Sequence, residues 1–154
     1  FSMEQFNELI GQYREKNNGP QLRLQLRQGR GYLKGVIDLV FENEGRYFVA
    51  DYKSNHLGDA ASDYDGAAMQ HAMWDHQYDV QYLIYLLALH RHLKSTLPDY
   101  QPEKNLGGAA YLFLRGMQGE VESGVYFQPP DMEMIEALDA LFSGVMPESP
   151  PVAI

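Results

Sequence analysis

Two aspartates in neighbouring apolar stretches constrain this chain more than any other feature. Asp38 lies in the stretch GVIDLVF at residues 35–41, and Asp51 opens the triplet DYK at residues 51–53. Both stretches have the composition of a buried β-strand, and a turn at residues 44–45 links them. Because an unpaired ion is costly to bury, strands of this kind do not normally carry charges. Two carboxylates and a lysine in such a core indicate a purpose, and the usual one is a divalent metal ion beside a catalytic lysine.

The position of the turn predicts how these side chains are arranged. If Glu44 and Gly45 form a two-residue hairpin loop, Asp38 pairs directly with Asp51. Directly opposed residues of an antiparallel pair point to the same face, with Cβ atoms about 5 Å apart. Lys53 shares that face because side chains alternate along a strand. A slip of one residue would put the acids on opposite faces, so the turn favours a cluster of all three.

The rest of the chain alternates between helical and strand patterns. We expect helices at 2–17 (with Ser2 as N-cap), 66–75, 78–97 and 131–142. Strands are expected at 22–26, 32–41, 46–53, 107–115 and 125–127, with loops at 54–65 and 100–106. The strands at 32–41 and 46–53 are apolar on both faces, which is typical of central strands covered by helices. The sequence predicts an α/β fold, with one domain over residues 1–145 and a flexible tail at 146–154.

Composition narrows the class of protein. The length of 154 residues suits one domain. The absence of cysteine removes disulfides and thiolate zinc sites and suits a reducing compartment, so we expect a cytoplasmic protein without a membrane span. The net charge of −9 argues against binding nucleic acid through the overall field, although a metal-dependent nuclease needs an acidic site. The main basic segment is compatible with either a phosphate track or a solvated strand face; it comprises Arg23, Arg27, Arg30 and Lys34.

The acids and the lysine have a direct chemical interpretation. Mg²⁺ prefers oxygen ligands and usually takes one or two carboxylates, which Asp38 and Asp51 would supply, and the carbonyl of Tyr52 could add a third oxygen. A bound metal lowers the pKa of a water molecule and stabilises charge on a phosphate. Lys53 could orient the attacking water or neutralise the developing charge. The alternative is a buried ion pair between Lys53 and one aspartate, which leaves the other acid uncompensated.

Other candidate residues carry weaker signals. Gln81 and Tyr85 are four residues apart on the expected long helix and share one face. Spacing alone favours a tyrosine packed on the sheet with the glutamine at the rim. None of the five histidines forms a pair at i, i+4, and His56, the nearest in sequence to the acids, is a candidate for substrate contact. The chain has neither a GxxxxGK[ST] phosphate loop nor a GxSxG serine hydrolase motif.

In order, these segments resemble the signature of the PD-(D/E)xK nucleases, with the QxxxY motif of their RecB-type branch. The signature consists of GVID at residues 35–38, DYK at 51–53 and QYLIY at 81–85. The bare D…DxK pattern is weakly specific, whereas the ordered set is strong. Longer strings closely resemble the C-terminal nuclease domain of RecB-type proteins from about residue 20 to the end; they include KGVIDLVF at 34–41, DYKSN at 51–55, LHR at 89–91 and YLFLRG at 111–116.

This resemblance implies a restriction-endonuclease-like core, with a mixed central β-sheet flanked by helices, and Mg²⁺-dependent exodeoxyribonuclease activity. It implies that metal-activated water hydrolyses DNA phosphodiesters during double-strand-break repair and recombination. By position, Asp38 and Asp51 resemble the metal-binding acids, Tyr52 the carbonyl ligand and Lys53 the catalytic lysine, while Gln81 and Tyr85 match the motif that lines the site. The implied partners are RecC-like and RecD-like subunits, a DNA single strand delivered by the helicase, and the RecA recombinase.

One departure from the family pattern concerns the metal. The family has a further histidine ligand on a helix upstream of the first aspartate, but no histidine precedes Asp38 here, and the chain begins at Phe1. We therefore expect an excised C-terminal fragment with an incomplete metal site, which leaves its isolated activity in doubt. Two other functions stay open: a docking module for a RecA-type recombinase, which the acidic composition suits, and a stand-alone PD-(D/E)xK nuclease such as a resolvase or restriction enzyme.

Overall fold

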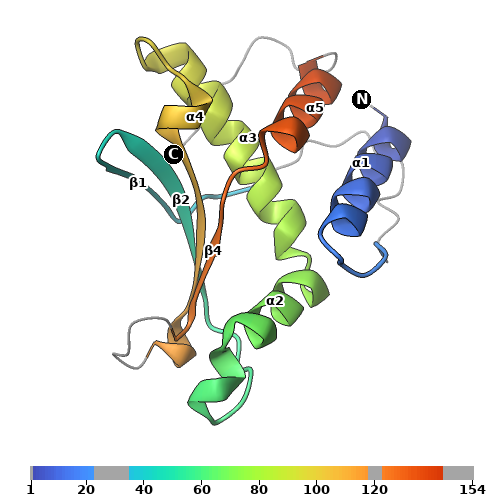
Figure 1. Cartoon of the computed structure of the whole chain (residues 1–154), viewed down its shortest axis with the longest axis vertical. Helices are drawn as coiled ribbons and strands as arrows, with labels where there is room; N and C mark the ends of the chain where they lie inside the picture. Colours follow the sequence, from blue (N-terminus) through green and yellow to red (C-terminus); the bar gives the residue numbers. More distant parts are fainter. Residues whose placement is uncertain (1, 23–34, 118–122, 144–154) are drawn as a thin grey trace. The chain divides into compact units, whose positions relative to one another are not determined.

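The computed structural model describes residues 2–22, 35–117 and 123–143, which fall into two compact units (Figure 1). Helices α1 (Met3–Lys16) and α5 (Met132–Ser143) belong to one unit, and the described strands and remaining helices belong to the other, which spans residues 36–130. The basic segment, most of the strand expected at 22–26, and the tail at 146–154 lie outside the described residues. The single domain over residues 1–145 stays a prediction.

In the first unit, α1 and α5 bury their apolar sides and contact each other. The hydroxyl of Ser2 caps α1 as predicted, because it accepts a hydrogen bond from the backbone N–H of Gln5 at 3.3 Å. The ring of Phe6 lies edge-on against Phe142, with 6.0 Å between the ring centroids. The buried apolar residues of the two helices are Phe6, Ile10, Tyr13, Met134, Ile135 and Leu138.

The second unit is built on a mixed sheet of four strands in the order β1-β2-β3-β4 (Figure 1). Strands β1 (Leu39–Asn43) and β2 (Arg46–Lys53) are antiparallel, β2 and β3 (Leu106–Phe113) are parallel, and β3 and β4 (Val125–Gln128) are antiparallel. The parallel step needs a crossover, which α2 (Gly66–Asp75) and α3 (Tyr78–Thr96) provide. The short helix α4 (Pro102–Asn105) leads into β3, and single 3₁₀ turns occupy Ala61–Tyr64 and Leu114–Gly116.

The hairpin between β1 and β2 has the predicted two-residue turn. Glu44 and Gly45 both have positive φ, 52° and 77°, as a type I′ turn requires. Asn43 therefore pairs with Arg46, and the ladder runs back to Leu39 opposite Ala50. The predicted register is therefore confirmed for Leu39–Asn43, whereas Asp38 lies one residue beyond the ladder and does not pair with Asp51 in it.

Helix α3 packs on the face of the sheet that carries the odd-numbered residues of β2 and β3. Tyr111 on β3 contacts Tyr82 on α3, with 6.2 Å between the ring centroids. Alternation places Asp51 and Lys53 on the same face as Val49. The predicted apolar stripe of α3 is confirmed, since all four of its members are buried; they are Tyr82, Leu86, Leu89 and Leu93.

The opposite face of the sheet differs from the expectation of central strands covered on both sides. Strands β1 and β4 are the two edges of the described sheet, and each carries exposed apolar residues: Leu39 and Phe41 on β1, and Val125 and Phe127 on β4. The ring of Phe48 stacks on Phe41 at 5.0 Å and lies 6.2 Å from Phe127. Within the described unit, β2 and β3 are therefore the central strands, and the prediction of a doubly covered strand is wrong for β1.

Element boundaries also differ in places. The strand predicted at 32–41 begins only at Leu39 in its described part, because residues 35–38 are irregular. Strand β3 ends at Phe113 rather than at residue 115, where a 3₁₀ turn takes over, and the expected loop at 100–106 contains α4. None of the described helices combines the length and apolar character needed to cross a bilayer.

Candidate active site

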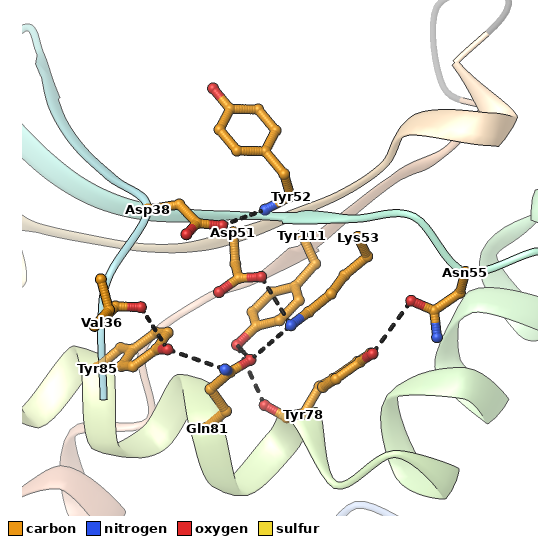
Figure 2. Close-up of polar contacts among 10 residues, drawn as sticks. All are labelled: Val36, Asp38, Asp51, Tyr52, Lys53, Asn55, Tyr78, Gln81, Tyr85 and Tyr111. Carbon is orange, nitrogen blue, oxygen red and sulfur yellow. Dashed lines mark hydrogen bonds and ion pairs between the residues drawn. The ribbon is translucent and has the colours of Figure 1, made fainter. Parts of the chain in front are cut away.

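Strand β2 and helix α3 bring Asp51, Lys53 and Gln81 into direct contact (Figure 2). The Nζ atom of Lys53 lies 2.8 Å from Oδ1 of Asp51 and donates to Oε1 of Gln81 at 3.1 Å. The side chains of Lys53 and Asp51 are only 12% and 6% exposed. The strand period thus places the acid and the lysine on the side of the sheet that faces α3.

Gln81 and Tyr85 form a continuous hydrogen-bonded chain with their neighbours (Figure 2). Besides Lys53, the Oε1 atom of Gln81 accepts from the hydroxyl of Tyr111 at 3.0 Å, and its Nε2 atom donates to the hydroxyl of Tyr85 at 2.9 Å. The Tyr85 hydroxyl in turn donates to the carbonyl of Val36 at 2.8 Å. Tyr85 is buried, as the interpretation from spacing alone expects, while the half-buried Gln81 hydrogen-bonds to three side chains.

Asp38 occupies a different environment from the one predicted. It is exposed and lies one residue before β1, so its expected position in a buried strand is wrong. Its Oδ2 atom accepts a hydrogen bond from the backbone N–H of Tyr52 at 3.0 Å. The carboxylate thereby takes the donor that a continuing β-ladder would have used, while the Val36 carbonyl bonds to Tyr85 instead of to a strand.

The electrostatics show that the two acids act on each other. Burial raises the pKa of Asp51, Lys53 lowers it through its hydrogen bond and charge, and the charge of Asp38 raises it; the net direction is upward. Burial likewise raises the pKa of Tyr85, with further contributions from Asp51 and Asp38. Lys53 therefore compensates Asp51 incompletely, and this part of the unit favours an additional positive charge.

The ion pair that stood as the alternative to a metal site is present between Lys53 and Asp51. This pair does not leave a second buried acid uncompensated, because Asp38 is exposed. A functional interpretation needs support from the rest of the arrangement and from relatives.

Comparison with protein families supplies that support. Residues 2–148 match the family described as the PD-(D/E)XK nuclease superfamily. The chain belongs to the PD-(D/E)XK nuclease superfamily. The mixed sheet flanked by helices confirms the predicted restriction-endonuclease-like α/β fold for this nuclease.

Individual relatives point to one branch of the superfamily. The chain is 45% identical over 142 residues to the RecBCD enzyme subunit RecB of Haemophilus influenzae, which covers 92% of this chain and 12% of that protein. It is 49% identical over 123 residues to RecB of Escherichia coli, which covers 79% of this chain and 10% of that protein. The chain is 43% identical over 120 residues to the RecB subunit of Mycobacterium tuberculosis, a match that covers 73% of this chain and 11% of that protein. The nuclease chain thus spans roughly a tenth of the length of these RecB proteins.

PD-(D/E)XK nucleases use divalent metal ions, and the donor atoms present suit a hard cation. Asp51 uses Oδ1 for Lys53, and Asp38 uses Oδ2 for Tyr52, so neither described contact occupies the second oxygen of either acid. The raised pKa of Asp51 also indicates that a nearby cation would be favourable. Within the described parts of the chain, no three His, Cys, Asp or Glu side chains gather as a metal-binding group. The fit is therefore to a cation that takes two carboxylates and keeps water as its other ligands.

Sequence reasoning missed three residues: Tyr78 and Tyr111, whose rings lie near Nζ of Lys53, and Asn55, which contacts Tyr78. Tyr111 donates to Gln81, and the ring of Tyr78 lies 3.9 Å from Nζ of Lys53, measured to its centroid. The hydroxyl of Tyr78 donates to Oδ1 of Asn55 at 3.2 Å. Alternation along β3 could have placed Tyr111 on the face of the acids, but no local pattern marks Tyr78. His56, the candidate for substrate contact, is exposed and lies 2.9 Å from Asp59, so its role stays a prediction.

Proposed function

We propose that this nuclease chain is the metal-dependent DNA nuclease domain of a RecB-like helicase–nuclease and hydrolyses DNA phosphodiesters. The observation that carries the proposal is the convergence of a carboxylate, a lysine and a glutamine, from Asp51, Lys53 and Gln81, beside the exposed carboxylate of Asp38. Phosphodiester hydrolysis needs oxygen ligands for a cation and a positive charge near the phosphate, and this cluster supplies both.

Each residue has a role that follows from its surroundings. Asp38 and Asp51 would hold Mg²⁺ through their second oxygens, and the backbone carbonyl of Tyr52 is the candidate third ligand. When bound, Mg²⁺ lowers the pKa of a coordinated water and offsets charge on the phosphate. Lys53 holds a proton and a positive charge beside Asp51, where it can donate to a phosphate oxygen or orient the attacking water. Gln81 fixes the position of Lys53, and Tyr85 fixes Gln81.

The wider setting comes from the RecB relatives. The name of these relatives places them in a RecBCD enzyme, so we propose RecC-like and RecD-like partners and a DNA strand as the substrate. Exonucleolytic action on a delivered single strand, and a part in double-strand-break repair and recombination, belong to the same proposal.

The test separates catalysis from folding. In the full chain, and in the complete complex, Asp51→Asn and Lys53→Met should each lower the rate of DNA cleavage with Mg²⁺ or Mn²⁺ by at least about a hundredfold, the range seen when a charge-stabilising group is removed. Asp75→Asn, an exposed acid on α2, serves as the matched control and should cleave normally. In the complex, DNA unwinding should persist in all variants. Continued digestion by both site variants would refute the proposal.

Metal binding provides a second test. Calorimetric titration with Mg²⁺ or Mn²⁺ should give heat of binding with the wild-type chain and little with Asp51→Asn. A version extended upstream should bind more tightly if a further ligand precedes this segment. Equal binding by the wild type and Asp51→Asn would contradict the assignment of Asp51.

The second candidate function is a docking module for a RecA-type recombinase. The net charge of −9 and the exposed apolar residues of β1 and β4 favour a protein partner over DNA at that face. A pulldown with purified recombinase should then lose signal with Phe127→Gln and keep it with Lys53→Met. The reverse pattern would reject docking at this face.

A further inference from the structure

The surroundings of Lys53 contain an aromatic group with no part in the chemistry described so far. An ammonium group has three N–H donors. Two of those of Lys53 meet Asp51 and Gln81, and the described residues offer it no third acceptor. Instead, Nζ lies 3.9 Å from the ring centroid of Tyr78 and 5.5 Å from that of Tyr111. The face of Tyr78 is therefore the third contact of the lysine (Figure 2).

The ring of Tyr78 is itself held in place. Its hydroxyl donates to Asn55, which follows Lys53 by two residues beyond the end of β2. The ring also stacks against His76 at 5.3 Å and against Tyr111 at 5.8 Å. Tyr78 is the first residue of α3 and follows Gln77, which has a left-handed backbone conformation. Its hydrogen bond to Asn55 therefore connects the start of α3 to the segment that follows β2.

We propose that Tyr78 is a positioning residue for Lys53, with Asn55 as the anchor of its ring; this rests on the proposed nuclease function, in which Lys53 acts on the phosphate. A ring face attracts a cation without accepting a directional hydrogen bond as a carboxylate does. The ammonium group is thereby held at the site, yet its third N–H can turn to an incoming phosphate oxygen. A carboxylate in place of the Tyr78 ring would accept the third N–H of Lys53 and compete for it with the phosphate of the substrate.

The decisive variants alter the ring and its anchor separately. Tyr78→Leu removes the π face and keeps an apolar side chain. Tyr78→Phe keeps the face and loses only the bond to Asn55, and Asn55→Ala loses the same bond from the other side. A desolvated cation–π contact corresponds to a change of about tenfold to thirtyfold. We expect Tyr78→Leu to lower kcat for cleavage of a single-stranded DNA oligonucleotide with Mg²⁺ by that factor with little change in KM, and Tyr78→Phe to stay within about threefold of the wild type.

A spectroscopic measurement tests the contact without relying on cleavage. The chain has five lysines, so ¹³C-lysine labelling gives a simple spectrum, and Lys53→Met identifies the resonance of interest. The ε-methylene protons of Lys53 should show an upfield ring-current shift in the wild type and in Tyr78→Phe, and lose it in Tyr78→Leu. If Tyr78→Leu fails to fold, Tyr78→Phe and Asn55→Ala provide the test: because both lose the same bond, both should show a smaller upfield shift than the wild type and a fall in kcat of no more than about threefold.

The two proposals fail separately. A Lys53 resonance that is unshifted in the wild type, or unchanged in Tyr78→Leu, overturns the positioning role even if cleavage is normal. Normal kcat in a folded Tyr78→Leu protein also overturns it. A shifted resonance in a wild-type protein that does not cleave DNA, alone or in its complex, overturns the nuclease function and with it the catalytic purpose of the contact.

Discussion

Replacing Lys53 by methionine should expose how the charge of Asp51 is compensated. Met keeps the aliphatic stem of the lysine but removes the ammonium group that lies 2.8 Å from Asp51. One charge-assisted hydrogen bond is lost, worth about 1.5–3 kcal/mol. Gln81 is not left without a donor, because its Oε1 atom also accepts from Tyr111 at 3.0 Å. We therefore expect Lys53→Met to lower the free energy of unfolding by about 2 kcal/mol at pH 7, which is less than the 3–5 kcal/mol typical of breaking a fully buried ion pair.

The loss should depend on pH in a definite direction. The pKa of Asp51 is already raised by burial, and removing Lys53 takes away the contributions that lower it. When the pKa of a carboxyl group is higher in the folded than in the unfolded state, the folded protein loses stability as the pH rises from the lower to the higher of the two pKa values. The loss of stability caused by Lys53→Met should therefore become smaller as the pH falls from 7 to 4, because protonation removes the negative charge that Lys53 no longer compensates.

Urea denaturation at the two pH values measures this difference. At pH 7 a loss of about 2 kcal/mol should lower Tm by about 4–8 °C for a chain of this size. Lys94→Met, an exposed lysine on α3, is the control and should change stability by less than about 0.5 kcal/mol. The double variant with Asp51→Asn should recover most of the loss, because neither charge remains. An equal loss at pH 4 and pH 7, or no recovery in the double variant, would refute this account.

Two further predictions concern the frame around the site. Tyr85→Phe removes the hydroxyl that joins Gln81 to the Val36 carbonyl, so stability in urea should fall by about 1–2 kcal/mol; Tyr126→Phe is a control on β4, and equal losses in both would speak against a special role for this bond. Gly108→Ala should lower the free energy of unfolding by at least about 2 kcal/mol, because φ is +133° and the new Cβ would lie 2.5 Å from the carbonyl oxygen of Gln128. The control Gly11→Ala, in α1 with nothing near the added Cβ, should raise the free energy of unfolding by about 0.5–1 kcal/mol in the same assay. A tolerated Gly108→Ala would contradict the close approach of β3 and β4.

The sequence was most informative where one local rule decides the geometry. The turn at Glu44 and Gly45 sets the register of the hairpin, and the strand period alone places Asp51 and Lys53 on one face of β2. The apolar stripe of α3 was equally accessible, because its period of 3.6 residues does not depend on the rest of the chain. Both inferences use properties of short segments alone.

The environment of Asp38 could not be predicted from a short segment of the sequence. The apolar residues around it are typical of a central strand, but β1 begins only at Leu39, so Asp38 lies outside the strand and is exposed. In this segment the polar groups have partners other than a β-ladder: the Val36 carbonyl accepts from Tyr85, and the carboxylate of Asp38 accepts from the N–H of Tyr52. The contact of Tyr78 with Lys53 is hidden for the same reason, since it depends on where α3 starts relative to the end of β2.

The spacing of Gln81 and Tyr85 gains a physical reason from the direction of the hydrogen bonds. The Val36 carbonyl can only accept, so the Tyr85 hydroxyl donates to it and has only lone pairs left for Gln81. Gln81 must then present its amide nitrogen to Tyr85 and its carbonyl oxygen to Lys53, because a flipped amide would set N–H groups against an ammonium group. Because Gln81 and Tyr85 are four residues apart, they lie on one face of α3, where Gln81 can bond both to Tyr85 and to Lys53. A backbone carbonyl two residues before Asp38 thus dictates which end of the glutamine meets the lysine, so the segment that carries one acid also orients the group beside the other.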